Sequence, residues 1–159
     1  MATAVDCAKY LNRLSSEETG RFLPEGCLQG MLYLCQRESL LLRDRPLFAD
    51  AFKAGPHGPA VPAVHAACRS GQLACGGLCS GTPALSPEDA VLVEAVWRRY
   101  NGVSRWDMVT IVCSEYSWTQ ARKGCTAEGC GREITMSAIR VDAKREALRR
   151  KGVILPPVK

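Results

Sequence analysis

Residues 28–65 of the 159-residue chain join a strongly apolar helical pattern to a cluster of prolines and glycines. Leu28, Met31, Leu32 and Cys35 follow the i, i+3, i+4, i+7 spacing that places side chains on one face of a helix. Residues 33–34 and 40–42 are apolar as well, which is typical of a helix buried in the centre of a small domain. Residues 55–62 cannot continue this helix, because their three prolines fix the backbone and remove hydrogen-bond donors. The stretch therefore predicts a buried helix followed by a rigid surface segment.

Capping signals predict further helices on both sides of this centre. Thr3 precedes an amphipathic pattern over residues 4–14, and Pro62 opens a modest helix over 63–69. Residues 47–53 are predicted as a turn or a minimal hairpin, and 72–87 and 124–132 as surface loops. The sequence predicts a mainly α fold, a single compact helical domain of about six helices over residues 1–159 with at most a small β element. The remaining helix starts are predicted at Ser86, Ser104 and Thr135, with a shorter turn from a capping box at Ser117 and Gln120.

Composition indicates an ordinary globular protein. Hydrophobic residues make up 47% of the chain and charged residues 23%, and no apolar run approaches the roughly 18 residues that span a bilayer. The first residues do not resemble a signal peptide, so we expect a cytoplasmic protein with no membrane partner. Nine cysteines cannot all pair, and a cytosolic chain of this length needs no disulfide framework, so we expect reduced thiols.

The net charge of +5 is concentrated near the C-terminus. Residues 119–159 carry ten basic and four acidic side chains, which predicts a basic patch on the last helix. The pattern has no aromatic interleaving and no helix-turn-helix signature. A solvated helix face is the commoner explanation of such a pattern, and among binding functions an acidic protein partner is favoured over DNA. The residues of the predicted patch are Arg140, Lys144, Arg145, Arg149 and Arg150.

Three motifs resemble the Panacea domain, an antitoxin-like domain of bacteria, phages and prophages. The first lies in the apolar helix, the second is a Gly-Pro signature, and the third, over residues 112–118, ends in Glu115 and Trp118. The resemblance runs over about residues 3–150 and leaves 151–159 as a C-terminal tail. The residues that match the first two motifs are Leu28, Gln29, Leu32 and Tyr33, followed by Ala54, His57, Gly58, Pro59, Val61 and Pro62.

The resemblance implies a non-enzymatic protein-binding module that needs no cofactor. Panacea antitoxins bind a toxin protein directly and suppress it, and at least one branch hands its partner to an ATP-dependent protease. This chain departs from the family at two informative positions. Gly30 stands where the family usually has Lys, and Cys113 replaces the His of the third motif, which speaks against chemistry by a family-wide histidine.

The predicted binding patch combines the Gly-Pro segment with the third motif. Prolines restrict this segment more than a simple connector needs, and Trp is over-represented at interface hot spots. We predict that His57, Val61, Glu115 and Trp118 form one partner-facing patch. The alternative is that Trp118 belongs to the core and the Pro-rich turn only packs against it.

Two other classes of function stay open. One is a phage or prophage regulator that binds nucleic acid through the basic last helix. The other is a small thiol- or metal-dependent enzyme, for which Cys113 and His57 would form a nucleophile pair. A zinc site would need the loosely spaced cysteine pairs Cys75, Cys79 and Cys125, Cys130.

Overall fold

A computed structural model of the chain describes residues 1–73, 85–125 and 131–159. Within these ranges it contains seven helices and one small antiparallel sheet, which confirms the predicted mainly α fold. In chain order the elements are α1 (Ala4–Thr19), α2 (Glu25–Arg43), β1 (Phe52–Gly55), β2 (Gly58–Ala60), α3 (Pro62–Arg69), α4 (Pro87–Tyr100), α5 (Arg105–Cys113), α6 (Tyr116–Arg122), β3 (Glu133–Ile134) and α7 (Met136–Arg150).

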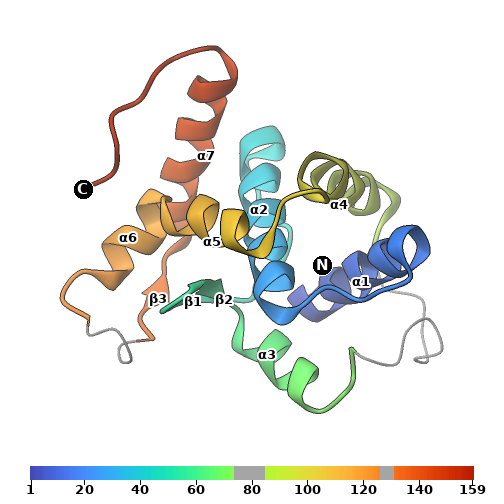
Figure 1. Ribbon diagram of the computed structural model, residues 1–159. Helices are drawn as coiled ribbons and strands as arrows, with labels where there is room; N and C mark the ends of the chain where they lie inside the picture. Colours follow the sequence, from blue (N-terminus) through green and yellow to red (C-terminus); the bar gives the residue numbers. More distant parts are fainter. Residues whose placement is uncertain (74–84, 126–130) are drawn as a thin grey trace.

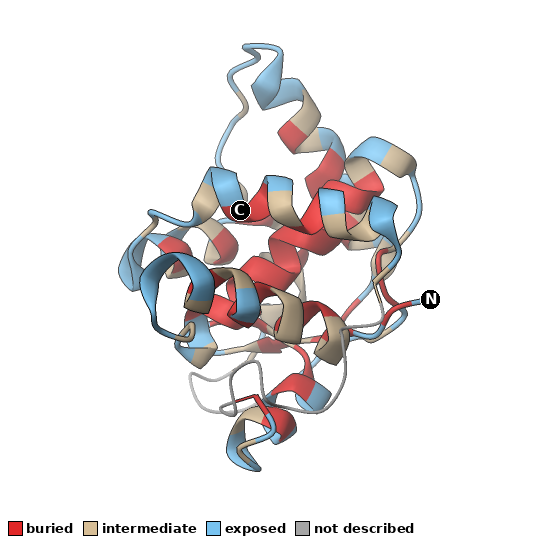
Figure 2. Cartoon of the chain, turned by 90° about the vertical axis from the view of Figure 1, so that its right-hand side faces the viewer, coloured by how far each residue is buried: buried red, intermediate tan, exposed pale blue. Residues whose placement is uncertain are grey.

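Helix α2 forms the centre of the molecule, as its sequence predicts. Figure 1 shows it surrounded by α1, α4, α5 and α7, and Figure 2 shows buried residues along most of its length. Leu32 and Tyr33 are fully buried, and every residue from 27 to 40 is buried. Burial of one leucine side chain stabilises a fold by about 1.5–3 kcal/mol, so this helix contributes much of the apolar stabilisation.

Short-range capping defines most of the other helices. Thr3 and Asp6 form a capping box at the start of α1, with each side chain bonded to the other residue's backbone N–H. The hydroxyls of Ser86, Ser104 and Thr135 accept bonds from the first turns of α4, α5 and α7. These four predicted helix starts are confirmed. They could be predicted because each capping hydroxyl lies three residues before the backbone N–H that it accepts.

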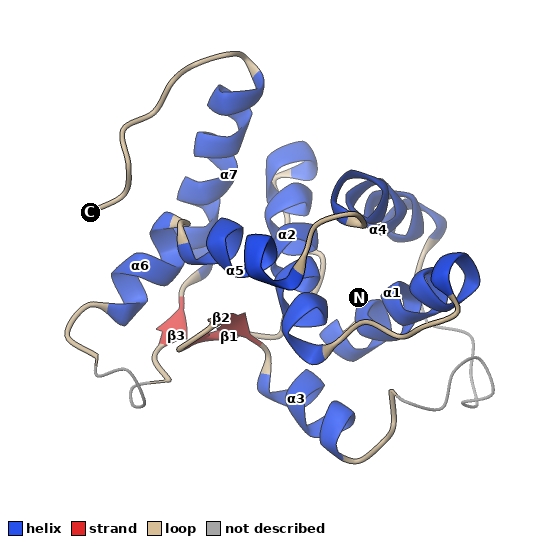
Figure 3. Ribbon diagram, in the orientation of Figure 1, coloured by secondary structure: helices blue, strands red, loops and turns tan. Residues whose placement is uncertain are grey.

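The sheet has strand order β2-β1-β3, with both pairs antiparallel (Figure 3). The hairpin lies later in the chain than predicted: β1 turns through residues 56–57 into β2, so the Gly-Pro segment supplies its second strand. Phe52 anchors the sheet in the core, with its ring 5.6 Å from that of Tyr33 and 5.8 Å from that of Phe48. Through these ring contacts the hairpin packs against the core around α2.

The cysteines and the helix lengths of the described residues can be compared with the prediction of reduced thiols and of no membrane-spanning run. Five cysteines in the described ranges carry free thiols: Cys7, Cys27, Cys35, Cys68 and Cys113. Cys7 and Cys35 are fully buried on the helical faces where the pattern placed them. None of the helices in the described part of the chain is long and apolar enough to cross a membrane.

Candidate functional site

The Gly-Pro hairpin is held tightly against α5. Gly55 and Gly58 pair across its two-residue turn, and Gly58 has φ = 135°, a conformation open to glycine but strained for other residues. A Cβ atom at Gly58 would lie 2.8 Å from a methyl group of Val112 on α5. Glycine is therefore required at position 58 for two reasons: its positive φ angle and the close approach of β2 to α5.

A buried glutamine of α2 fixes the chain just after the hairpin. The Gln29 side chain accepts a hydrogen bond from the backbone N–H of Val61 at 2.9 Å and donates one to the Val61 carbonyl at 3.3 Å. Gln36, two turns later, does the same for the 47–48 backbone, through Leu47 N–H at 2.7 Å and the Phe48 carbonyl at 2.9 Å. Both amides satisfy buried backbone groups that no ladder reaches, which explains polar residues inside an apolar helix.

Helix α6 holds the other side of the hairpin. The indole Nε1 of Trp118 donates to the Gly55 carbonyl at 2.8 Å, and Arg122 donates to the Ala54 carbonyl at 3.2 Å. The Arg122 guanidinium also lies 6.0 Å from the centre of the Trp118 ring, within range of a cation–π contact. Trp118 is partly exposed, so its indole braces the hairpin and still reaches the surface.

The four residues of the predicted binding patch do not share one surface. His57 is exposed at the tip of the hairpin and Trp118 is partly exposed beside it. Val61 and Glu115 are only 1% and 4% exposed, so their side chains cannot face a partner, which corrects this part of the prediction. Val61 caps α3 in the core, and Glu115 belongs to an internal network of charges. Partner contact by His57 and Trp118 stays a prediction.

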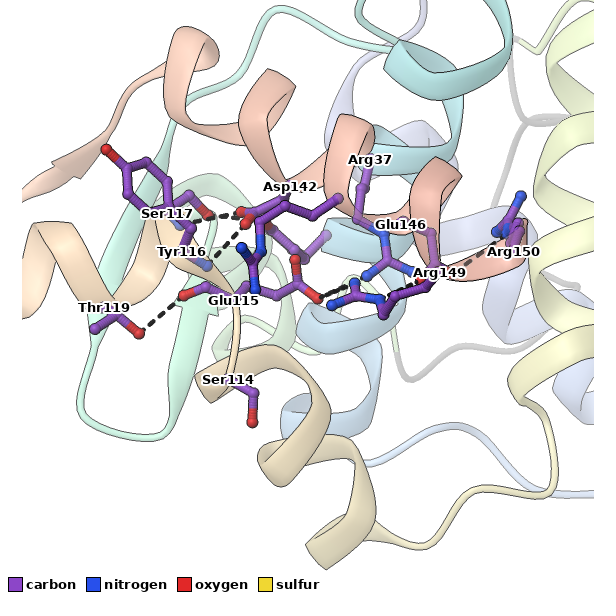
Figure 4. A network of polar contacts seen from close by, with 12 residues as sticks. Arg37, Ser114, Glu115, Tyr116, Ser117, Thr119, Asp142, Glu146, Arg149 and Arg150 are labelled. Atoms are coloured by element: carbon purple, nitrogen blue, oxygen red, sulfur yellow. Dashed lines mark hydrogen bonds and ion pairs between the residues drawn. The ribbon is translucent and has the colours of Figure 1, made fainter. Parts of the chain in front are cut away.

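A buried ion cluster joins α2, α7 and the start of α6 (Figure 4). Arg37, only 2% exposed, donates to Glu115 at 2.7 Å and lies 3.3 Å from Glu146. Its guanidinium also donates to the hydroxyl of Tyr100 at 3.0 Å. A buried cation of this kind is tolerated only when carboxylates surround it, so Arg37 and its partners depend on one another.

The C-terminal turns of α7 close this cluster. Arg149 lies 2.9 Å from Glu146 and 3.4 Å from Glu115, and Arg150 forms two bonds with Glu38, of 2.7 and 3.0 Å. These arginines point toward acidic residues of their own chain (Figure 4). The predicted basic patch is therefore much weaker than the sequence suggested, because internal carboxylates neutralise much of its charge.

The other members of that patch are divided as well. Arg140 is paired with Asp44 at the end of α2, and Arg145 donates to the Pro156 carbonyl at 2.9 Å. Lys144 is exposed and forms no ion pair within the described ranges. Of the five predicted basic residues, Lys144 and Arg145 have no acidic partner in the described part of the chain, and Arg145 is bonded to a backbone carbonyl.

Asp142 organises the junction between α6 and α7 and was missed in the sequence. It is fully buried and accepts the backbone N–H groups of Tyr116 at 2.7 Å and Ser117 at 3.1 Å, so it caps α6 from another helix. It also accepts the hydroxyl of Tyr33. The predicted capping box at Ser117 is wrong: Ser117 lies inside α6, and its hydroxyl bonds to that of Tyr33 at 2.7 Å.

Burial and mutual charge shift the pKa values in this cluster. Burial raises the pKa of Glu115 to about 7, because the nearby cation Arg37 offsets the lost hydration only in part. Glu146 is less buried and faces three arginines, which hold its pKa below the usual value despite the cost of burial. Burial and the adjacent Asp142 carboxylate raise the pKa of Tyr33, so its hydroxyl stays protonated and acts as a donor. The cluster therefore contains one poorly solvated carboxyl group, that of Glu115, and one firmly ionised carboxylate, that of Glu146.

The structure describes only part of the predicted zinc site but both residues of the predicted nucleophile pair. Cys75, Cys79 and Cys130 lie outside the described residues, and the Cys125 thiol, at the edge of a described range, donates to the Ala121 carbonyl at 3.6 Å. Within the described ranges no three acidic, histidine or cysteine side chains gather as metal ligands. Burial raises the pKa of the Cys113 thiol to about 11, which disfavours the thiolate that a nucleophile requires.

Comparison with known proteins identifies the family. The family described as "Antitoxin SocA-like, Panacea domain" matches residues 28–119, from the buried helix α2 through the Gly-Pro hairpin to α6. No curated protein and no solved structure matches the chain. The match spans more than half of the chain and covers the hairpin, Arg37 and Glu115 together. The chain therefore belongs to the SocA-like antitoxin family with a Panacea domain.

Proposed function

We propose that this protein neutralises a toxin protein by binding it directly, without catalysis of its own. Membership of an antitoxin family supports a protein partner. The observation that carries the proposal is the hairpin tip, where His57 is exposed on a backbone held by Gln29, Trp118 and close packing on α5. A surface that is already rigid loses little conformational freedom on binding.

The proposed mode of action is occlusion of the toxin's active region. The hairpin tip would contact the toxin, and the exposed part of Trp118 would add an aromatic anchor of the kind found at interface hot spots. A rigid contact of this type lengthens the lifetime of a complex mainly by slowing dissociation. The proposed setting is the cytoplasm, where the bound toxin could also be delivered to an ATP-dependent protease.

Two observations weigh against the alternative functions. The raised pKa of the Cys113 thiol disfavours a thiol-dependent enzyme. The pairing of Arg149 and Arg150 with Glu146 and Glu38 leaves less free charge for phosphate contacts, which disfavours a nucleic-acid regulator. Direct binding of a protein is the function that both observations leave in place.

The test is co-expression with each open reading frame that flanks the native gene, after each has been expressed alone to find out whether it is toxic. We expect the protein to restore growth of the host and to co-purify with the toxin as a stable complex. Repeating the growth assay in a host without its ATP-dependent proteases separates occlusion from proteolytic delivery: rescue that persists there supports occlusion.

Matched histidine variants locate the contact. His57→Ala removes the exposed side chain at the hairpin tip and should weaken toxin binding on the order of tenfold, as expected for an interface contact worth about 1.4 kcal/mol. The control is His65→Ala at the only other histidine, which pairs with Glu25 at the surface of α3. A toxin-like neighbour that the protein neither binds nor suppresses would refute the proposed function.

A further inference from the structure

A groove lies between the end of α2 and the adjoining face of α7. Its volume is about 500 Å³, within the range of about 300–1,000 Å³ that is usual for binding pockets. Leu40 and Leu41 line it from α2, and Ala143 and Ala147 line it from α7. The groove is separate from the Gly-Pro hairpin and takes no part in the internal ion cluster.

Small side chains and an early helix end create this hollow. Ala143 and Ala147 are one helical turn apart, so two methyl groups face the leucines of α2 where larger residues would fill the space. Helix α2 ends at Arg43, and its cap residue Asp44, with a left-handed φ of 53°, also lines the groove. Leu148, four residues after Lys144 on the same face of α7, is 40% exposed and extends the apolar surface outward.

The charges at the rim of the groove are not balanced. Arg140 is neutralised by Asp44, to whose backbone carbonyl it also donates at 3.3 Å. Lys144 also lines the groove and has no acidic partner in the part of the chain that the structure describes. A groove with an apolar floor and one uncompensated cation at its edge is complementary to an apolar segment that carries acidic residues.

We propose that this groove binds an acidic amphipathic helix of the protein partner. The apolar side chains of this helix would rest on Leu41 and Ala147, the two partly exposed apolar residues that line the groove, and one of its carboxylates would pair with Lys144. Helices commonly dock in this way, with anchors at i, i+3 or i+4, and i+7 in a hydrophobic groove. The inference rests on the proposed function, since it assigns a second contact surface to the same toxin complex.

A designed peptide tests the groove by itself. The probe is an 18-residue fluorescent peptide with leucines at i, i+4 and i+7 on one face and glutamates on the other, and its comparator carries lysines in place of the glutamates. Fluorescence anisotropy should show saturable binding of the acidic peptide to the full chain and much weaker binding of the basic one. Equal binding of both peptides, or binding of neither, would overturn the inference.

Two variants of the protein locate the contact. Lys144→Glu reverses the free charge without breaking an internal ion pair and should weaken binding of the acidic peptide on the order of tenfold. Ala147→Phe fills the groove and should abolish binding while the circular dichroism spectrum is retained. The matched control is Lys123→Glu, the same charge reversal at an exposed lysine at the end of α6. Loss of peptide binding by Lys123→Glu to the same extent would attribute the effect to net charge and overturn the inference.

The same variants separate this inference from the proposed function. If the wild type binds the neighbouring toxin and both groove variants bind it equally well, the groove inference fails and the antitoxin function stands. If the acidic peptide binds with the expected variant pattern but the toxin does not bind, the groove stands as an acidic-helix site and the antitoxin proposal fails. Weaker toxin binding in both variants, with Lys123→Glu unchanged, supports both.

Discussion

Replacing Arg37 by methionine tests whether the buried ion cluster holds the fold together. The substitution keeps an unbranched side chain but leaves Glu115 without its 2.7 Å partner in a site only 4% exposed. Removing one partner of a buried pair costs about 3–5 kcal/mol. Arg149 stays within 3.4 Å of Glu115 and 2.9 Å of Glu146, so we expect the lower end of this range, about 3 kcal/mol.

Urea unfolding followed by circular dichroism measures this loss. With an m value of about 2 kcal/mol per molar, the unfolding midpoint should fall by about 1.5 M. The control is Arg13→Met, the same substitution in an exposed pair with Glu17, which should cost less than about 0.5 kcal/mol. A midpoint for Arg37→Met within about 0.3 M of the wild type would refute the reasoning, because the cluster would then contribute little to stability.

A double-mutant cycle separates the pair from its surroundings. Glu115→Gln removes the negative charge, and Arg37→Met combined with Glu115→Gln removes both charges together. The double variant should be more stable than the sum of the single losses predicts, with a coupling of about 1–3 kcal/mol. Exact additivity would mean that Arg37 and Glu115 act independently of each other.

Three further results follow from burial, close packing and the raised carboxyl pKa. Leu32→Ala should destabilise the protein by about 2–5 kcal/mol. Leu42→Ala changes a leucine on the same helix that is 61% exposed and should cost under about 0.5 kcal/mol, and the melting temperatures of the two variants test this difference. Gly30→Ala should destabilise the protein by about 1–3 kcal/mol, because the new Cβ would lie 2.6 Å from a buried methionine of α5. The control Gly26→Ala, whose Cβ would lie 3.8 Å from its nearest neighbour, should be neutral or stabilising, and urea titrations measure both variants. The pKa of Glu115 is raised to about 7 in the folded protein, so between pH 4.5 and 7 the folded protein holds a proton on Glu115 that the unfolded chain has lost. The free energy of unfolding should therefore fall as pH rises through this window. Urea midpoints at pH 5 and 7 should therefore differ less in Glu115→Gln than in the wild type, and equal differences would contradict the assignment.

The departure of Gly30 from the usual family lysine has a structural reason in this chain. A side chain at this position would meet Cγ and Sδ of Met108 at 2.6 and 2.7 Å, so α5 packs closer to α2 than a lysine Cβ allows. The substitution is therefore tied to the packing of these two helices. The glycine thus avoids a basic side chain at a position that is buried in this chain.

Features that depend on neighbours in the sequence were predictable. The helix starts at Thr3, Ser86, Ser104 and Thr135 follow from hydroxyls three residues before the amide that each satisfies. The burial of α2 followed from apolar residues on most sides of the helix, and the break after it from three prolines. In each of these signals the two interacting residues lie within one or two helical turns of each other, so their spacing in the sequence is enough to predict the interaction.

The internal charges were decided by tertiary structure. Arg37 and Glu115 are 78 residues apart, and Tyr33 and Asp142 are 109 apart, so no local pattern pairs them. Charged residues are usually exposed, and the last arginines of α7 do lie at the surface as predicted. Their pairing with Glu38 and Glu146 is set by the fold. Likewise Ser117 lost its predicted capping role because Asp142, brought in by α7, satisfies the same helix end. A buried charge is affordable only where folding brings its counter-charge within contact, and that distance exists only in three dimensions.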